Sequence, residues 1–237
     1  MIYQTFSFAI SSEPKKIDSP DKIYQKLGQR IDVNLSFINQ DGKTQTIHDL
    51  LKNNSALILT LNYYRCTTMC TFQFLNLAQV LKELSMPIGK GFEVASISFD
   101  PTDTVQKAKQ IHDTWVPKTG YANANWNFFV GTPANIEPLT KQLNFYYEKD
   151  DEGNYSHAAA LFFVQPDGTF YRYLYGIVYD KSGVEQALYD TSKGALGSIL
   201  DKFYRLFYKY DPVRGKYFSN WDPAASPVGS PRDDNKL

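Results

Sequence analysis

The sequence predicts an α/β fold built on a largely parallel sheet. Apolar runs of strand length alternate with segments of helical periodicity, and the last two strands are joined by a tight turn at residues 165–168. Strands that alternate with helices favour parallel pairing, with helices covering both faces of the sheet. The chain has 237 residues, of which 43% are hydrophobic and 15% aromatic, so it can bury a sizeable core.

The expected elements follow in chain order. Residues 33–38 and 43–47 flank a Gly-containing turn and predict a hairpin, and residues 48–52 predict a short helical turn. Further strands are expected at 56–63, 92–99, 125–130, 155–164 and 169–175, and helices at 72–84, 100–115, 132–143 and 193–208. This order predicts a thioredoxin-like fold with a mostly parallel central sheet, an N-terminal hairpin extension and a late antiparallel hairpin.

Two helices have a recognisable start in the sequence. Asp100-Pro101 and Thr132-Pro133 each combine a capping residue with a proline that fits the first helical position. Asp100 is therefore expected to cap a helix, although Asp100 and Asp103 could also serve as acid–base or docking groups.

The chain divides into an N-terminal arm at residues 1–24, a thioredoxin-like domain at 25–209 and a C-terminal tail at 210–237. Residues 2–11 are mostly apolar and end in a small-x-small pattern, so the arm is either a signal-peptide remnant or an ordinary extended segment. No apolar run reaches the roughly 18 residues that a membrane span needs, so we expect none. The tail, rich in Pro, Gly and Ser, is expected to be disordered near its end.

The charge balance argues against nucleic acid as a partner. Lys and Arg number 25, Asp and Glu also number 25, and no long basic run occurs. Phosphate binding requires a clustered positive surface. The charges are therefore expected to form a mixed, solvated surface.

The only two cysteines, Cys66 and Cys70, are separated by three residues. Two cysteines cannot form the disulfide framework of a small secreted domain, and so short a loop makes a poor stabilising crosslink. The pair falls where a strand passes into a helix, a position that stabilises thiolates. Metal binding and reversible oxidation to a disulfide are both compatible with this placement.

The three histidines and Met69 are the candidates for further ligands. His48 and His112 stand in polar segments and are expected at the surface, whereas His157 follows a charged loop at the start of an apolar strand. Two thiolates and one imidazole suit copper better than a closed zinc site, which normally takes four ligands. Met69 is a conceivable soft ligand, but packing or exposure is the simpler interpretation.

An ordered set of motifs resembles the Sco/SenC family. The segments that carry the resemblance are residues 63–70, 92–101, 126–133, 155–157 and 166–168, in family order and spacing over roughly residues 25–217. The family comprises thioredoxin-fold proteins that help deliver copper to the binuclear centre of cytochrome c oxidase.

The resemblance implies a copper chaperone with Cys66, Cys70 and His157 as ligands. It implies as partner the copper-bearing oxidase subunit or another copper or thiol client. The implied compartment is the periplasm beside the inner membrane, or alternatively the mitochondrial intermembrane space. Where family members commonly have Pro, Asp and Pro, this chain has Thr67, Thr68 and Thr71, which are expected to loosen the site or retune its thiols.

Other functions remain open on the sequence. The same pair, Cys66 and Cys70, could serve a thiol–disulfide oxidoreductase that reduces client cysteines, so whether the protein is an enzyme is undecided. A redox or copper sensor that acts by protein contact is a third hypothesis. A peroxiredoxin-type peroxidase is disfavoured, because Tyr63 occupies the position where that chemistry typically has Thr.

Overall fold

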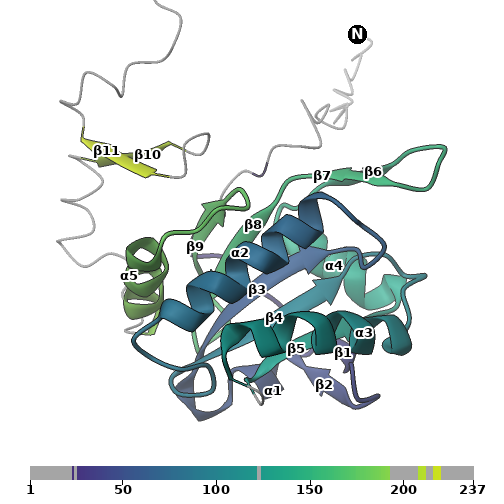
Figure 1. The fold of residues 1–237 in the computed structure, drawn as a ribbon, viewed down its shortest axis with the longest axis horizontal. Helices are drawn as coiled ribbons and strands as arrows, with labels where there is room; N and C mark the ends of the chain where they lie inside the picture. Colours follow the sequence, from purple (N-terminus) through teal and green to yellow (C-terminus); the bar gives the residue numbers. More distant parts are fainter. Residues whose placement is uncertain (1–22, 24–25, 122–123, 193–207, 212–215, 220–237) are drawn as a thin grey trace, which may run out of the picture.

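A computed structural model of the chain describes residues 23, 26–121, 124–192, 208–211 and 216–219. Its centre is a seven-stranded sheet in the order β2-β1-β5-β4-β3-β8-β9 (Figure 1). The strands of this sheet are β1 (Ser36–Asn39), β2 (Thr44–Thr46), β3 (Ala56–Asn62), β4 (Phe92–Ser98), β5 (Trp126–Val130), β8 (Ala160–Val164) and β9 (Phe170–Tyr175). Strands β3, β4 and β5 are parallel, and the hairpins β1–β2 and β8–β9 flank them antiparallel.

Strand β3 lies inside the sheet and shows why its sequence is uniformly apolar. All seven of its residues are buried, including Thr60 and Asn62. A strand covered by helices or loops on both faces has no solvent side, so alternation of apolar and polar residues gives way to a continuous apolar run.

Helices cover both faces of the sheet. They are α1 (Ile47–Leu50), α2 (Met69–Glu83), α3 (Val105–Trp115), α4 (Pro133–Gln142) and α5 (Lys181–Ser192), with short 3-10 turns η1 (Lys52–Asn54) and η2 (Val116–Thr119). Helices α2 and α3 cross one face and α4 lies behind the sheet, while α5 packs against α2, β8 and β9 (Figure 1). This arrangement confirms the predicted α/β fold with a parallel centre.

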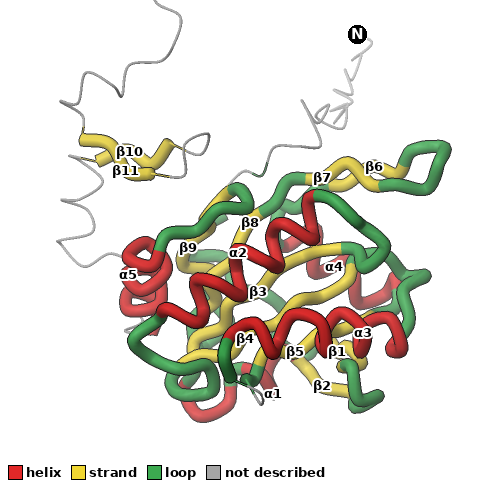
Figure 2. The backbone as a smooth tube through the Cα atoms, viewed as in Figure 1, coloured by secondary structure: helices red, strands yellow, loops and turns green. Residues whose placement is uncertain are grey.

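The strand expected at residues 155–164 is in fact two strands in two different sheets. Strand β7 (Tyr155–His157) pairs antiparallel with β6 (Tyr147–Lys149), whereas β8 belongs to the central sheet. Figure 2 shows the β6–β7 hairpin reaching past the end of α2. The apolar run continued through the break at Ala158 and Ala159, so the sequence alone did not reveal it.

The helix expected at residues 100–115 begins at Val105, so the prediction that Asp100 caps it is wrong. Thr104 is the capping residue, and its hydroxyl accepts a hydrogen bond from the Lys107 N–H at 3.2 Å. Asp100 instead accepts from the N–H of Thr102 at 2.9 Å and closes a local turn. Helix α5 was not predicted.

The C-terminal part is described only in pieces. The helix predicted at 193–208 lies outside the described residues except for its last position, which begins strand β10 (Tyr208–Asp211). This strand pairs antiparallel with β11 (Lys216–Ser219). The proposed disorder near the end of the tail also falls outside the described residues, and the division into arm, domain and tail stays a prediction.

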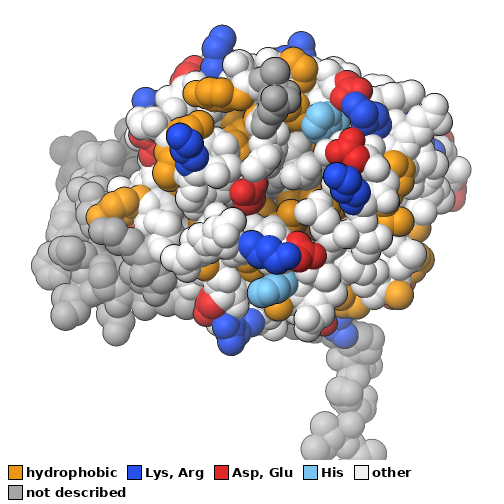
Figure 3. Space-filling view, turned by 90° about the horizontal axis from the view of Figure 1, so that it is seen from below, with side chains coloured by type: hydrophobic (Ala, Val, Ile, Leu, Met, Phe, Trp, Pro, Cys, Tyr) orange, Lys and Arg blue, Asp and Glu red, His pale blue; other side chains and the backbone are white. Residues whose placement is uncertain are grey.

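Two surface properties bear on function. On the face shown in Figure 3, basic and acidic side chains are interspersed, in line with the equal numbers of both charges in the sequence. No helix in the described part of the chain has the length and hydrophobicity required to cross a membrane.

Candidate functional site

The two cysteines lie at the carboxyl end of the parallel strands, where β3 leads into α2. Cys66 belongs to the connecting loop and is partly exposed, whereas Cys70 lies in the first turn of α2 and is buried. Both are free thiols. Ligands and reactive groups commonly gather at this edge of an open α/β sheet.

The sulfur of Cys66 takes the place of a helix cap. Thr68 occupies the capping position of α2, but its side chain makes no capping hydrogen bond. Instead, the backbone N–H of Cys70 points to the Cys66 Sγ at 3.5 Å. The free N–H groups and the positive end of the helix dipole favour negative charge at this sulfur.

The same contacts separate the acidities of the two thiols. The pKa of Cys66 is lowered to about 4 by hydrogen bonds from the Cys70 thiol, the Cys70 and Thr68 N–H groups and the Tyr63 side chain, against the effect of burial. The pKa of Cys70 is raised by its hydrogen bond to Cys66, by burial and by the Cys66 charge. Cys66 is therefore the thiolate of the pair, and Cys70 holds its proton.

His157 closes the site from the β6–β7 hairpin. Its Nε2 lies 3.8 Å from the Cys70 Sγ, and its Nδ1 lies 2.9 Å from the carbonyl oxygen of Ala158. A carbonyl oxygen can only accept, so Nδ1 carries the proton and Nε2 has a free lone pair. Burial lowers the pKa of His157, against the Ala158 carbonyl and the Cys66 charge, and so favours the neutral ring.

Three aromatic rings fix the orientation of the His157 imidazole. The ring centroids of Phe99, Phe145 and Tyr63 lie 5.0, 5.7 and 5.8 Å from that of His157. Phe99 and Tyr63 meet the imidazole edge to face, a favourable arrangement of aromatic pairs. These rings were not among the predicted site residues, although Tyr63 and Phe99 directly follow β3 and β4.

Two of the unusual threonines contact the Cys66 loop. The Thr71 hydroxyl donates to the Cys66 carbonyl oxygen at 3.3 Å, and the Thr68 Oγ1 lies 3.9 Å from the Cys66 Sγ. A proline at position 71 would offer no hydroxyl for the first of these contacts. The Thr71 hydrogen bond thus restrains the loop at a position where a proline ring would otherwise do so.

The structure brings the predicted site residues together only in part. Cys66 and His157 each approach Cys70, but no group of three His, Cys, Asp or Glu side chains in the described ranges is gathered closely enough to hold a metal ion as it stands. His48 is exposed on α1, and His112 lies 2.9 Å from a carboxylate oxygen of its neighbour Asp113 on α3. Half of the Met69 surface is exposed.

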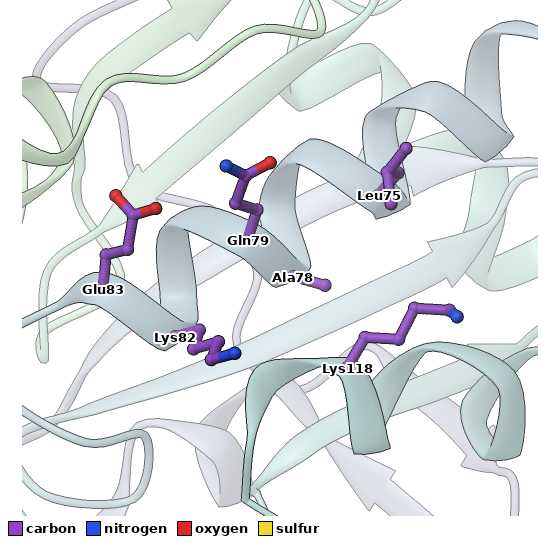
Figure 4. Close-up of a pocket in the computed structure, with 6 residues that line it drawn as sticks. All are labelled: Leu75, Ala78, Gln79, Lys82, Glu83 and Lys118. Atoms are coloured by element: carbon purple, nitrogen blue, oxygen red, sulfur yellow. The ribbon is translucent and has the colours of Figure 1, made fainter.

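A shallow groove runs along the other end of α2 (Figure 4). It is lined by Leu75, Ala78, Gln79, Lys82, Glu83 and Lys118. None of these side chains is a typical ligand for a soft metal or a redox group. The groove is therefore not part of the cysteine site.

Comparison with known proteins identifies a matching family model. Residues 24–188, well over half of the chain, match the model described as SCO1/SenC. No curated protein sequence matches the chain.

Three solved structures illustrate the structural likeness. A candidate electron transfer protein from Aquifex aeolicus VF5 has a TM-score of 0.65 at 21% identity, covering 73% of this chain and 98% of that chain. Arabidopsis thaliana ScoI with copper bound has a TM-score of 0.55 at 24% identity, covering 69% of this chain and 99% of that chain. BsSco is a member of the Sco family of cytochrome c oxidase assembly proteins, and a disulfide switch has been identified in it. Its structure has a TM-score of 0.59 at 20% identity, covering 76% of this chain and 99% of that chain. At these identities the likeness establishes the fold, and it agrees with the predicted thioredoxin-like arrangement.

Proposed function

Because the chain belongs to the SCO1/SenC family, we propose that it binds copper through Cys66, Cys70 and His157 and delivers it during assembly of the cytochrome c oxidase copper centre. One observation carries the assignment of the ligands. Although His157 is far from both cysteines in the sequence, its free Nε2 faces the Sγ of Cys70. The thiol pair that this imidazole approaches lies at the carboxyl end of the parallel strands.

The donor set fits copper chemically. Two sulfurs and one imidazole nitrogen are soft or borderline ligands, which Cu(I) favours. Cys66 is already a thiolate, and the imidazole presents a lone pair rather than a proton. Metal binding would have to draw Cys66 and His157 together around Cys70, and it would displace the proton of Cys70.

The difference in burial between the ligands suggests an order of release. Cys66 is partly exposed, whereas Cys70 is buried. A thiolate or imidazole of the client can reach a copper ion most easily from the Cys66 side. Cys66 is therefore the ligand to be exchanged first, while Cys70 and His157 hold the ion until the client has bound it.

The proposed client is the copper-bearing subunit of cytochrome c oxidase, with another copper or thiol protein as the alternative. BsSco and the copper-bound Arabidopsis protein support this choice as relatives in fold. We propose the periplasm beside the inner membrane as the compartment, with the mitochondrial intermembrane space as the alternative, and the family membership supports this choice.

An anaerobic Cu(I) titration in competition with a chromogenic chelator tests the proposal. The reduced protein should bind one copper ion per chain, and His157→Ala should weaken binding by about tenfold or more, since one ligand is lost. His112→Ala provides the matched control and should bind as the wild type does. Equal affinities for His157→Ala and the wild type would show that His157 is not a ligand.

A second candidate function is reduction of a client disulfide. It is favoured by the contrast between an accessible thiolate, Cys66, and a buried protonated thiol, Cys70. The Cys66 thiolate would attack the client disulfide, release one client thiolate and form a mixed disulfide. Cys70 would then lose its proton and displace the second client thiolate, leaving the Cys66–Cys70 disulfide.

The two functions differ in their need for His157. The first step of disulfide reduction is the attack of the Cys66 thiolate, which needs no proton acceptor, so His157→Ala should leave the rate of mixed-disulfide formation unchanged if this candidate is correct. Mixed-disulfide formation that is indifferent to His157, with no loss of copper affinity in the same variant, would favour the reductase over the chaperone.

A further inference from the structure

We infer that Asp100 and Asp103 are positioning residues that hold the loop of residues 64–66, so that the Cys66 sulfur faces Cys70. Both carboxylates follow β4, the neighbour of the strand that leads into the cysteine loop. The inference rests on the proposed use of Cys66 and Cys70 as a pair, whether for copper or for a disulfide.

Asp103 forms the first of two tethers, here called the inner tether, and it holds Tyr64. Its backbone N–H donates to the Asp103 carboxylate at 2.8 Å, and the same carboxylate oxygen accepts from the Ser98 hydroxyl at 2.6 Å. The Tyr64 hydroxyl lies 2.8 Å from the carbonyl oxygens of both Ser96 and Phe129, on β4 and β5. Backbone and side chain of this residue are thus fixed to the sheet.

Asp100 forms the second tether, here called the outer tether, and it holds Arg65. Its guanidinium lies 2.7 Å from Oδ2 of Asp100, a side chain with no exposed surface. The other oxygen of Asp100 accepts from the N–H and the hydroxyl of Thr102 at 2.9 and 2.7 Å. An ion pair with one fully buried and well-oriented partner constrains a side chain more than an exposed pair does.

These tethers leave little freedom before Cys66. Tyr64 and Arg65 are both fixed, and the Cys66 N–H bonds back to the Tyr63 carbonyl oxygen at 3.2 Å. On the other side, the Thr71 hydroxyl holds the Cys66 carbonyl. The sulfur is thereby confined to the N-terminal end of α2, beside Cys70, and the effective concentration of one sulfur at the other is high.

Helix capping does not explain why two carboxylates are held at this position after β4. Helix α3 begins at Val105 and is capped by Thr104, so neither Asp100 nor Asp103 is needed for its start. Burial of a carboxylate is costly unless it is paired. Their partners in the cysteine loop are Tyr64 and Arg65. Ser98 and Thr102, which also bond to them, lie at the end of β4 and in the turn that follows it.

The test measures the equilibrium between the Cys66–Cys70 dithiol and glutathione disulfide. In this reaction the Cys66 thiolate and the Cys70 thiol, which loses its proton, are oxidised and form one S–S bond, while glutathione disulfide takes up the two electrons and is reduced to two glutathione molecules. Loss of a tether should lower the equilibrium constant by about fivefold to tenfold, because the two sulfurs are then less often adjacent. No copper is involved, so failure of the chaperone proposal would not affect the outcome.

Two variants separate tethering from charge. Arg65→Ala removes a positive charge near the thiolate, whereas Asp100→Asn removes a negative one. A purely electrostatic effect would shift the equilibrium in opposite directions, while loss of the tether would lower it in both. Because the two residues act as one tether, the double variant should be no worse than either single variant.

Arg30→Ala serves as the matched control. It breaks another Arg–Asp pair, between Arg30 and Asp167 at 3.3 Å, in the turn before β9 at the opposite end of the sheet. This control should leave the equilibrium constant unchanged.

Asp103→Ala tests the inner tether, with Asp103→Asn as a second variant should the alanine protein fail to fold. Constants within twofold of the wild type for both Arg65→Ala and Asp100→Asn, or an equal loss in Arg30→Ala, would overturn the inference.

Discussion

Cys66 and Cys70 have the same side chain but opposite properties. Cys66 lies in a partly exposed loop at the start of α2 and accepts hydrogen bonds, whereas Cys70 is buried and donates one. Position relative to the helix terminus thus decides which sulfur carries the charge. The sequence predicted thiolate stabilisation at this junction, but it could not assign it to one cysteine.

The acidity of Cys66 can be measured by alkylation with iodoacetamide. Only the thiolate reacts, so the rate at Cys66 should stay nearly constant as the pH falls from 8 to about 6 and decrease towards the lowered pKa of about 4. Peptide mapping should find Cys70 protected throughout. In denaturant both thiols should titrate with a pKa near 8.5, about the ordinary value. A native rate that drops tenfold with each pH unit below 8 would contradict the assignment.

At the scale of elements, local patterns predicted the strands and helices of the core well, and they failed where the chain leaves it. The strands β3, β4 and β5 were found within about two residues, because continuous apolar runs mark buried strands. The β6–β7 hairpin was missed, since its pairing depends on contacts between segments without strong periodicity. The orientation of His157 follows from that hairpin, so the residues alone left its role open.

The corrected start of α3 leads to a prediction about capping. The Thr104 hydroxyl accepts the Lys107 N–H, whereas Thr132, at the same position of α4, makes no side-chain capping bond. Thr104→Ala should therefore lower the free energy of unfolding by about 1 kcal/mol. Thr132→Ala is the matched control and should cost clearly less. Urea unfolding of both variants measures the difference, and equal losses would show that the hydroxyl of Thr104 does not cap α3.

At the scale of the whole molecule, a chain of buried polar groups connects the sheet to α2. The Trp126 indole N–H donates to the Ser96 hydroxyl at 2.9 Å, and Ser96 lies 2.8 Å from the Thr60 hydroxyl. Thr60 in turn meets Asn62 at 2.6 Å, and the Asn62 amide donates to Gln73 at 2.8 Å. All five side chains are fully buried. A sequence pattern shows these residues as isolated polar positions in apolar segments, so the network could not be predicted from it.

Gln73 is the link between this network and α2, and its loss should destabilise the whole fold. Gln73→Leu would leave the buried Asn62 amide without its acceptor and the Ala160 carbonyl without the donor that now lies at 3.2 Å. An unsatisfied buried polar group costs about 1–3 kcal/mol, so the free energy of unfolding should fall by about 2 kcal/mol or more.

Gln79→Leu is the matched control, because it makes the same change at an exposed position of the same helix. It should change the free energy of unfolding little. Urea unfolding followed by fluorescence and by circular dichroism should give coincident transitions for both variants, because the network and the helix belong to one cooperative core. Equal stabilities of the two variants would show that the network does not hold α2 on the sheet.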